Sequence, residues 1–279
     1  MPRRCELGYL ALGTTCSRTA PCKTFAGAIS KTAAFGEINC LDSGRLRRPD
    51  DHQVDHRELR LHPRIRTGRG TNGIVINAAA ADKVTLRGIQ LQGRADTASP
   101  GLNGVRILSA KTVSIVNCVI TQFSQAGISD VRTAGNTLLF VRNTIISNNT
   151  GNAISLTATA SNKAIIEDSS LINGVASGLG VGNLNNAYVT RTVIAGNASS
   201  GIVNDGGSAI NVDSSSITSN GTGITANGVI RLSNSDVTLN STGFSGAVTT
   251  YGNNRTLGNT LLGTAPTAAG GAVNNLGEQ

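Results

Sequence analysis

The sequence has no tryptophan, and phenylalanine and tyrosine together make up only 3% of its 279 residues. A compact α/β enzyme normally uses more aromatic side chains in its core, so this composition argues against that class. Long apolar runs are also missing, and none approaches the ~20 residues needed to cross a bilayer. The chain is instead rich in glycine, with 34 residues, and in asparagine, serine and threonine, which is typical of short strands joined by tight turns.

Charged residues are few, at 14%, although the net charge is +8. Residues 44–70 carry eight arginines and four acidic residues, so this segment alone contributes +4. Residues 71–279 carry eleven basic and nine acidic residues, a net charge of only +2. A nucleic-acid groove needs basic residues clustered on one face, with aromatic side chains for stacking. Because the body of the chain has neither, we expect no nucleic-acid partner. The lack of long apolar runs likewise predicts no membrane span.

Histidine is equally scarce, and all three histidines, His52, His56 and His62, lie in the arginine-rich segment 44–70. The spacing of His52 and His56 would place two imidazoles on one helix face, as some zinc sites require, with Asp55 or His62 as a third ligand. Such a helix would have no apolar face to dock it, so we expect no metal site here.

The same segment shows neither strand alternation nor a glycine turn. Read one nucleotide later, the codons for residues 50–56 permit Thr-Ile-Thr-Lys-Ser-Ile-Thr, which alternates as a strand does. Our hypothesis is that a frameshift enters near Gly44 and is restored near Gly70; the alternative is a genuine histidine cluster.

Residues 71–262 form a repeat. Its anchor residues are spaced 29, 26, 25, 23, 23 and 20 positions apart and are Gly88, Asn117, Asn143, Asp168, Arg191, Ser214 and Asn234. The residues four before, two before and three after each anchor are apolar without exception. Each unit therefore holds two or three strands of period two, joined by glycine and asparagine corners, with no room for a crossover helix. This pattern predicts an all-β fold, a parallel β-helix solenoid of about eight coils.

The chain on either side of the solenoid differs from the repeat. Residues 21–38 place Phe25, Ile29 and Ala33 at helical spacing, which predicts a short amphipathic helix that caps the first coil. The predicted organisation is thus a cysteine-containing segment with this helix and a first strand (1–43), the irregular segment (44–70), the solenoid (71–262) and a flexible tail (263–279).

Three stretches resemble a known family: CSRTAPCKTFAGAISKTAAFGEINCLDSG, TNGIVINAAAADKVTLRGIQLQG and YGNNRTLGNT. They are similar to the right-handed parallel β-helix proteins of pectin-lyase-like fold, and within them to an uncharacterised, usually exported bacterial group. The resemblance implies an extracellular or periplasmic protein, although residues 1–20 contain no convincing signal peptide. In an exported protein, Cys16 and Cys22 would form a disulfide. The fold hosts lyases, hydrolases, adhesins and inert rods, so it does not by itself imply an activity.

Enzymes of this fold use recognisable acidic residues. The lyases hold calcium with acidic clusters, and the hydrolases use nearby aspartates. The hydrolase signatures Asn-Thr-Asp and Gly-His-Gly are absent, while Asp130 and Asp205 are expected at similar corners three coils apart, roughly 14 Å. We therefore expect a non-catalytic protein without a cofactor; the alternative is a polysaccharide lyase or glycoside hydrolase, with calcium only for a lyase.

A candidate binding surface follows from the repeat, because residues three before the anchors point outward. In consecutive coils these are Phe140, Ile165 and Tyr188, flanked by Leu138, Lys163, Arg142 and Glu167. An exposed apolar and aromatic stripe with flanking charges suits a polysaccharide or a surface protein; the alternative is that a loop or the tail covers it. The sequence does not predict an oligomeric state.

Other residues are expected to be structural. Arg142 with Glu167, and Asp168 with Arg191, should form exposed salt bridges between coils. Cys118 is predicted to be a buried thiol. The asparagines six after the anchors, Asn149, Asn197, Asn220 and Asn240, should bond backbone groups at the corners and stack between coils.

Overall fold

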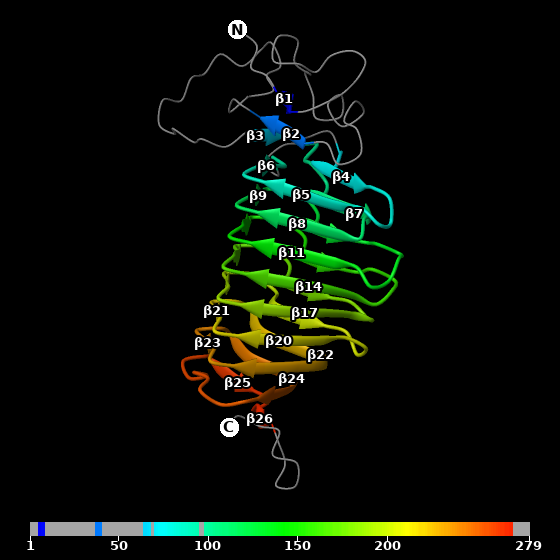
Figure 1. The fold of residues 1–279 in the computed structure, drawn as a ribbon. Coiled ribbons are helices and arrows are strands. Elements are labelled where there is room, and N and C mark those ends of the chain that lie inside the picture. Colours follow the sequence, from blue (N-terminus) through cyan, green and yellow to red (C-terminus); the bar gives the residue numbers. More distant parts are fainter. Residues whose placement is uncertain (1–4, 9–36, 41–63, 68–69, 95–97, 270–279) are drawn as a thin grey trace. The chain divides into compact units, whose positions relative to one another are not determined.

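The computed structural model describes residues 5–8, 37–40, 64–67, 70–94 and 98–269 (Figure 1). The chain divides into two compact units, Met1–Arg66 with Gly88–Gln90, and Thr67–Arg87 with Leu91–Gln279. In the first unit, β1 (Cys5–Gly8) pairs antiparallel with β2 (Glu37–Cys40), and Cys5 lies opposite Cys40. This unit also contains β3 (Arg64–Arg66).

The second unit is a parallel β-solenoid of about eight coils, as the repeat predicts, with three strands in each coil. Sheet A contains β5 (Lys83–Arg87), β8 (Thr112–Val116), β11 (Leu138–Arg142), β14 (Asn162–Glu167), β17 (Asn185–Thr190) and β20 (Ala209–Asp213). Sheet B contains β6 (Gln90–Gln92), β9 (Val119–Thr121), β12 (Ile145–Ser147), β15 (Ser170–Ile172), β18 (Val193–Ala195), β21 (Ser216–Thr218) and β23 (Asp236–Thr238). Sheet C contains β4 (Ile74–Asn77), β7 (Val105–Ser109), β10 (Ile128–Asp130), β13 (Ile154–Leu156), β16 (Leu179–Val181) and β19 (Ser200–Asn204).

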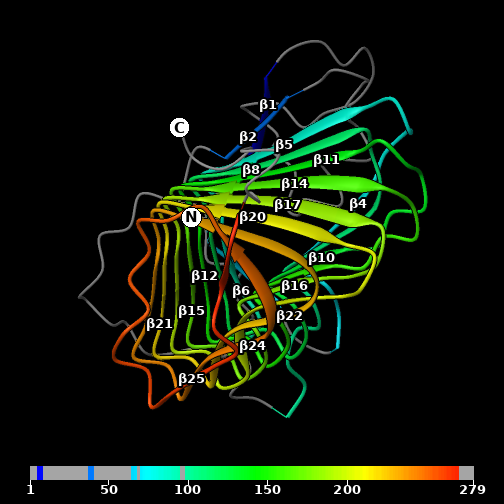
Figure 2. The ribbon, with the colours of Figure 1, turned by 90° about the horizontal axis from the view of Figure 1, so that it is seen from below.

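The last coils merge two of these sheets. Strand β22 (Thr222–Ser233) pairs with β19 in sheet C and then with β20 in sheet A, and β24 (Thr242–Thr250) pairs along it. The short strands β25 (Leu261–Gly263) and β26 (Thr267–Ala268) pair with β24. Strand pairing therefore continues beyond residue 262, where the sequence predicts the tail to begin. Figure 2, viewed from below, separates sheets A, B and C as three sides around the core.

The core consists of the apolar positions of the repeat. All of them are buried except Val84 and Leu86 in β5, which are half-buried. Because side chains alternate across a strand, the residues between these positions face solvent. In β11, for example, Leu139 and Val141 are fully buried, whereas Arg142 is exposed.

The anchor residues are corners in a left-handed backbone conformation. All seven have positive φ, from 46° at Asn143 to 65° at Gly88. A second left-handed residue follows five positions after every anchor except Gly88; these are Gln122, Asn148, Asn173, Gly196, Ser219 and Leu239. Glycine is suitable here because it has no Cβ, and asparagine and aspartate because their short polar side chains can hydrogen-bond locally. Each coil thus turns sharply on both sides of its sheet B strand.

Two hydrogen-bonded ladders run between the coils at these corners. In the first, a buried hydroxyl accepts from the backbone N–H one coil earlier and donates to a carbonyl of its own corner; its members are Thr144, Ser169, Thr192, Ser215 and Ser235. Cys118, buried and unbridged as predicted, occupies the preceding position. In the second ladder, Asn197 donates to Asn220, which donates to Asn240, which donates to Asn259. The predicted structural role of the corner asparagines is confirmed.

Some predictions concern residues that the structure does not describe. His52, His56 and His62 lie there, as do Cys16 and Cys22. The capping helix expected over residues 21–38 also lies outside the described residues, apart from its last two, which belong to β2. No helix in the described part of the chain is long and apolar enough to cross a membrane.

Candidate functional site

The outward face of sheet A brings the predicted stripe together. Phe140 in β11 is paired with Ile165 in β14, which is paired with Tyr188 in β17. Phe140 and Ile165 are half-buried, whereas the Tyr188 side chain is 41% exposed. The three side chains therefore form one continuous column that crosses the strands. We call this column, with its flanking residues, the sheet A stripe.

A second column flanks it on the side where the strands begin. Leu138, Lys163 and Asn186 are neighbours in the same three strands. Lys163 is exposed, and Leu138 and Asn186 are half-buried. The oxygen Oδ1 of Asn186 accepts from the backbone N–H of Ala209 at 3.1 Å, which fixes the amide at the edge of the stripe.

The stripe continues beyond the residues predicted from the sequence. Tyr188 is paired with Asn211 in β20, and Asn211 is paired with Arg231 in β22. Nη1 of Arg231 donates to Oδ1 of Asn211 at 3.4 Å. Both residues occupy the outward position three before an anchor, so the period of the repeat is sufficient to predict that they belong to the stripe.

On the opposite flank, where the strands end, charges neutralise one another. Arg142 lies 3.3 Å from Glu167 and 3.6 Å from Asp168, and Arg191 lies 3.4 Å from Glu167 and 2.7 Å from Asp168. The predicted salt bridges are confirmed and join into one network of two cations and two anions. Hydrogen bonding to Arg191 lowers the pKa of Asp168, and the same contact raises the pKa of Arg191.

Asp213 lies one coil further along this flank. Burial raises the pKa of its carboxyl, but hydrogen bonds from Ser233, Asn234 and Ser214, with the charge of Arg191, lower it more, so that the net shift is downward. Asp236 forms a bidentate ion pair with Arg255, and hydrogen bonding to Arg255 lowers its pKa as well. These carboxyls are therefore held in the charged form.

The two aspartates considered for catalysis do not form a site. Asp130 is buried and forms a bidentate pair with Arg132, at 2.9 Å and 2.5 Å, while Nη1 of Arg132 donates to the carbonyls of Ala110 and Leu138. Asp205 is exposed. Their corners are close but not equivalent, because Asp130 aligns through sheet C with Asn204, the residue before Asp205. Asp130 therefore has a structural role, as the buried countercharge of Arg132.

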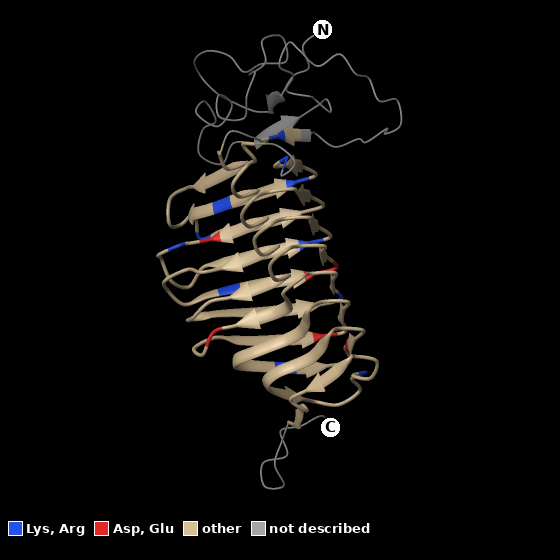
Figure 3. Cartoon of the chain, turned by 180° about the vertical axis from the view of Figure 1, so that it is seen from behind, with Lys and Arg blue, Asp and Glu red and all other residues tan. Residues whose placement is uncertain are grey.

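Charged side chains are sparse elsewhere, and most of the ribbon in Figure 3 is tan. Within the described ranges, no three His, Cys, Asp or Glu side chains come together as a metal site requires.

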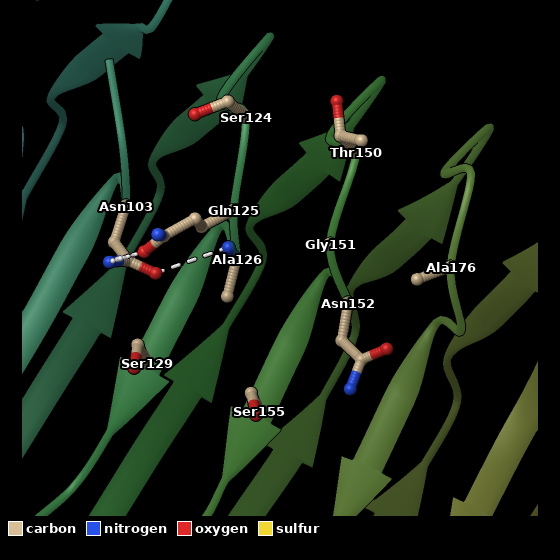
Figure 4. A pocket seen from close by; sticks show the side chains of 10 residues that line it. All are labelled: Asn103, Ser124, Gln125, Ala126, Ser129, Thr150, Gly151, Asn152, Ser155 and Ala176. Carbon is tan, nitrogen blue, oxygen red and sulfur yellow. Dashed lines mark hydrogen bonds between the residues drawn. The ribbon is translucent and has the colours of Figure 1, made fainter. Parts of the chain in front are cut away.

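A shallow groove lies at the corner that leads into sheet C (Figure 4). It has a volume of about 400 Å³, and its lining comes from four consecutive coils. The lining is uncharged and non-aromatic, with small residues such as Ala126, Gly151 and Ala176 beside amides and hydroxyls. The amide of Asn103 donates to Gln125 at 2.8 Å within it. The groove offers hydrogen bonds but no apolar platform, so the sheet A stripe is the stronger candidate site.

Successive coils stack so that their strands form three parallel sheets around the core, and hydrogen-bonded ladders join the coils at the corners. These features define the class of parallel β-helix proteins. The family of the right handed beta helix region matches residues 70–261, and the chain belongs to this family. No curated protein matches the sequence. Among solved structures, pectate lyase Pel9A is 12% identical with a TM-score of 0.43, covering 73% of this chain and 69% of that chain. The A-modules of two Azotobacter vinelandii mannuronan C-5 epimerases are also similar. AlgE4 is 11% identical with a TM-score of 0.39, covering 74% and 81% of the two chains. AlgE6 is 14% identical with a TM-score of 0.37, covering 76% and 78%.

Proposed function

We propose that this chain is a non-catalytic, exported β-helix protein that binds a glycan or a protein partner along the outward face of sheet A. The observation that carries the proposal is the strand register, which aligns Phe140, Ile165 and Tyr188 in one column. Among the exposed large apolar side chains of the described residues, Tyr188 is the one aromatic. Aromatic side chains combine a large apolar surface with a polar edge, and they are enriched where proteins bind partners.

The state of the carboxylates supports a binding role over a catalytic one. A glycosidase needs one carboxyl whose pKa is raised, so that it can donate a proton at neutral pH. The carboxyls of Asp168, Asp213 and Asp236 are shifted downward instead. Asp130 is occupied by the buried Arg132. The alternative function, a lyase or hydrolase, would need an acid or base outside these four residues.

The test compares binding with turnover. The full chain is incubated with uronate and neutral polysaccharides, with and without calcium, while retention and product formation are both measured. We expect retention on at least one immobilised glycan or on a surface protein extract, without product. Tyr188→Ala and Phe140→Ala should weaken retention, and Val193→Ala, which removes a similarly exposed side chain from sheet B, should not. Product formation by the unsubstituted chain would contradict the non-catalytic role, and retention unchanged by both stripe substitutions would contradict the binding face.

The location is tested separately. Fractionation of cells that carry the native gene should recover the protein outside the cytoplasm. Recovery in the cytoplasm alone would contradict export and leave the binding role standing.

A further inference from the structure

We infer that the ligand of the sheet A stripe is an uncharged, extended β-1,4-linked glycan that lies across the strands, along the axis of the solenoid. This inference rests on the proposed function of the same face. It adds the ligand class and the direction in which the ligand runs, and both follow from the spacing and charge of the stripe.

The spacing of the aromatic side chains selects an extended chain. Phe140 and Tyr188 lie two strands apart, which is about 10 Å in the direction of strand pairing. Successive sugars of an extended β-1,4-linked glycan turn by about half a revolution, so every second ring presents the same face to a surface. A sugar on Phe140 and the second sugar after it on Tyr188 can therefore use the same face, with the sugar between them over Ile165. The C–H groups of that face meet the electron-rich faces of the aromatic rings.

The charges beside the stripe select an uncharged ligand. A polyuronate carries one carboxylate on each sugar and needs cations repeated along its path. The cations where the strands end, Arg142 and Arg191, are each paired with Glu167 and Asp168. Along the aromatic column itself, the three positions from Phe140 to Tyr188 carry no charge. Lys163 and Arg231 lie three strands apart, which does not provide one cation per sugar.

Hydrogen-bond donors lie where the hydroxyls of such a chain would reach. Asn186 and Asn211 both use Oδ1 within the protein, toward Ala209 and Arg231, so each amide presents its N–H groups to a ligand. Tyr188 lies two residues after Asn186 in β17 and is paired with Asn211 in β20. Amide donors beside an aromatic platform give orientation and specificity to a site whose affinity comes from apolar contact.

The experiment is calorimetric titration of the full chain with oligosaccharides of equal length that differ in charge or in chain shape. Cellohexaose and mannohexaose are neutral and extended, hexagalacturonate is anionic, and maltohexaose is neutral but coiled. We expect the extended neutral chains to bind more tightly than the other two. Tyr188→Ala should weaken this binding about tenfold, as the loss of one aromatic contact would. Val193→Ala should leave it unchanged, and circular dichroism should show that both variants keep the β-solenoid.

The other outcomes separate this inference from the proposed function. Preference for hexagalacturonate that is lost in Tyr188→Ala would overturn the neutral-ligand inference and keep the face as the binding site. Binding of maltohexaose equal to that of cellohexaose would overturn the extended geometry. Binding of no oligosaccharide would overturn the inference altogether, and the proposed function would then require a protein partner whose capture depends on Tyr188. Binding of neutral oligosaccharides that is unchanged in Phe140→Ala and in Tyr188→Ala would overturn both this inference and the proposed binding face.

Discussion

At the scale of single residues, the corners of the solenoid depend on the left-handed backbone conformation. Most corner residues are suited to it, and Leu239 is the clearest exception, with a φ of 58° and a side chain that is 67% exposed. A left-handed conformation costs an ordinary L-residue roughly 1–2 kcal/mol. In the preceding coils, Asn173, Gly196 and Ser219 occupy the equivalent position. Leu239 therefore holds a strained backbone conformation, and its largely exposed side chain adds little packing to offset it.

Leu239→Asn is expected to raise the free energy of unfolding by about 1 kcal/mol, because asparagine tolerates this conformation. Urea denaturation followed by circular dichroism measures the change. The control is Leu261→Asn, at a leucine that is 63% exposed but lies in the extended strand β25. An equal gain in both variants would show that removal of an exposed leucine, and not relief of strain, is responsible.

At the scale of the elements, the asparagine ladder has one gap. Gly174 occupies the ladder position between Asn149 and Asn197: it follows the left-handed Asn173, and its N–H donates to Oδ1 of Asn197 at 3.0 Å. Lacking a side chain, it leaves Nδ2 of Asn149 buried without a hydrogen-bond partner. The φ of Gly174 is not positive, so this position does not require glycine.

Gly174→Asn is expected to close the ladder. Its Oδ1 would accept from Nδ2 of Asn149, as Oδ1 of Asn220 accepts from Asn197 at 2.9 Å. A Cβ at this position would lie 3.0 Å from Oδ1 of Asn197, the movable end of a side chain. Satisfying one buried donor should raise the unfolding free energy by about 1–2 kcal/mol. Gly174→Ala is the control, since it adds the Cβ without the amide. If Gly174→Asn stabilises the protein no more than Gly174→Ala does, the missing amide is not the cause of the lost stability.

The loop between β10 and β11 depends on a different interaction, the buried pair of Asp130 and Arg132. Arg132→Ala is expected to cost about 3–5 kcal/mol, because it leaves the carboxylate of Asp130 without a countercharge in the core. Arg255→Ala breaks a comparable bidentate pair whose arginine is 79% exposed, and it should cost less than about 1 kcal/mol. Thermal unfolding compares the two variants. A similar loss in both would mean that burial does not determine the strength of these pairs.

At the scale of the whole molecule, stability is close to a sum over coils that contact only their neighbours, so exposed charge pairs between coils add to it. The folded state lowers the pKa of Asp168, Asp213 and Asp236. Each carboxylate therefore stabilises the fold above its ordinary pKa, near pH 4, and loses this contribution as the pH falls through its lower folded value. We expect the melting temperature to fall below about pH 4.

Melting curves recorded between neutral and strongly acidic pH test this expectation. Asp168→Asn should flatten the acid limb of the curve, because one linked proton is removed, and added salt should reduce the effect. Asp205→Asn, at an exposed carboxylate with no ion pair in the described part of the chain, is the matched control. An unchanged acid limb in Asp168→Asn would contradict the linkage.

The fold was largely predictable from the sequence. The apolar residues around each anchor specify strands whose inner face is buried, and short units without space for a helix leave stacked coils as the way to bury that face. The column of Phe140, Ile165 and Tyr188 followed from the same period, because parallel coils in register place equivalent positions side by side. Asn211 and Arg231 belong to the same column, although the predicted stripe ended at Tyr188.

The sequence predicted single pairs of charges between coils, but tertiary structure alone decided how the polar groups join into larger arrangements and which of them are buried. Asp130 was considered as a catalytic acid from its position, but the direction in which it points and its pairing with Arg132 depend on how one loop folds back on the core. Likewise, Arg142, Glu167, Asp168 and Arg191 become one network only when three coils stack. The period of a sequence determines the face on which a residue lies, because alternation is a local property of the backbone. The partners of a charge depend on loop paths and on contacts between coils, which the local pattern does not contain.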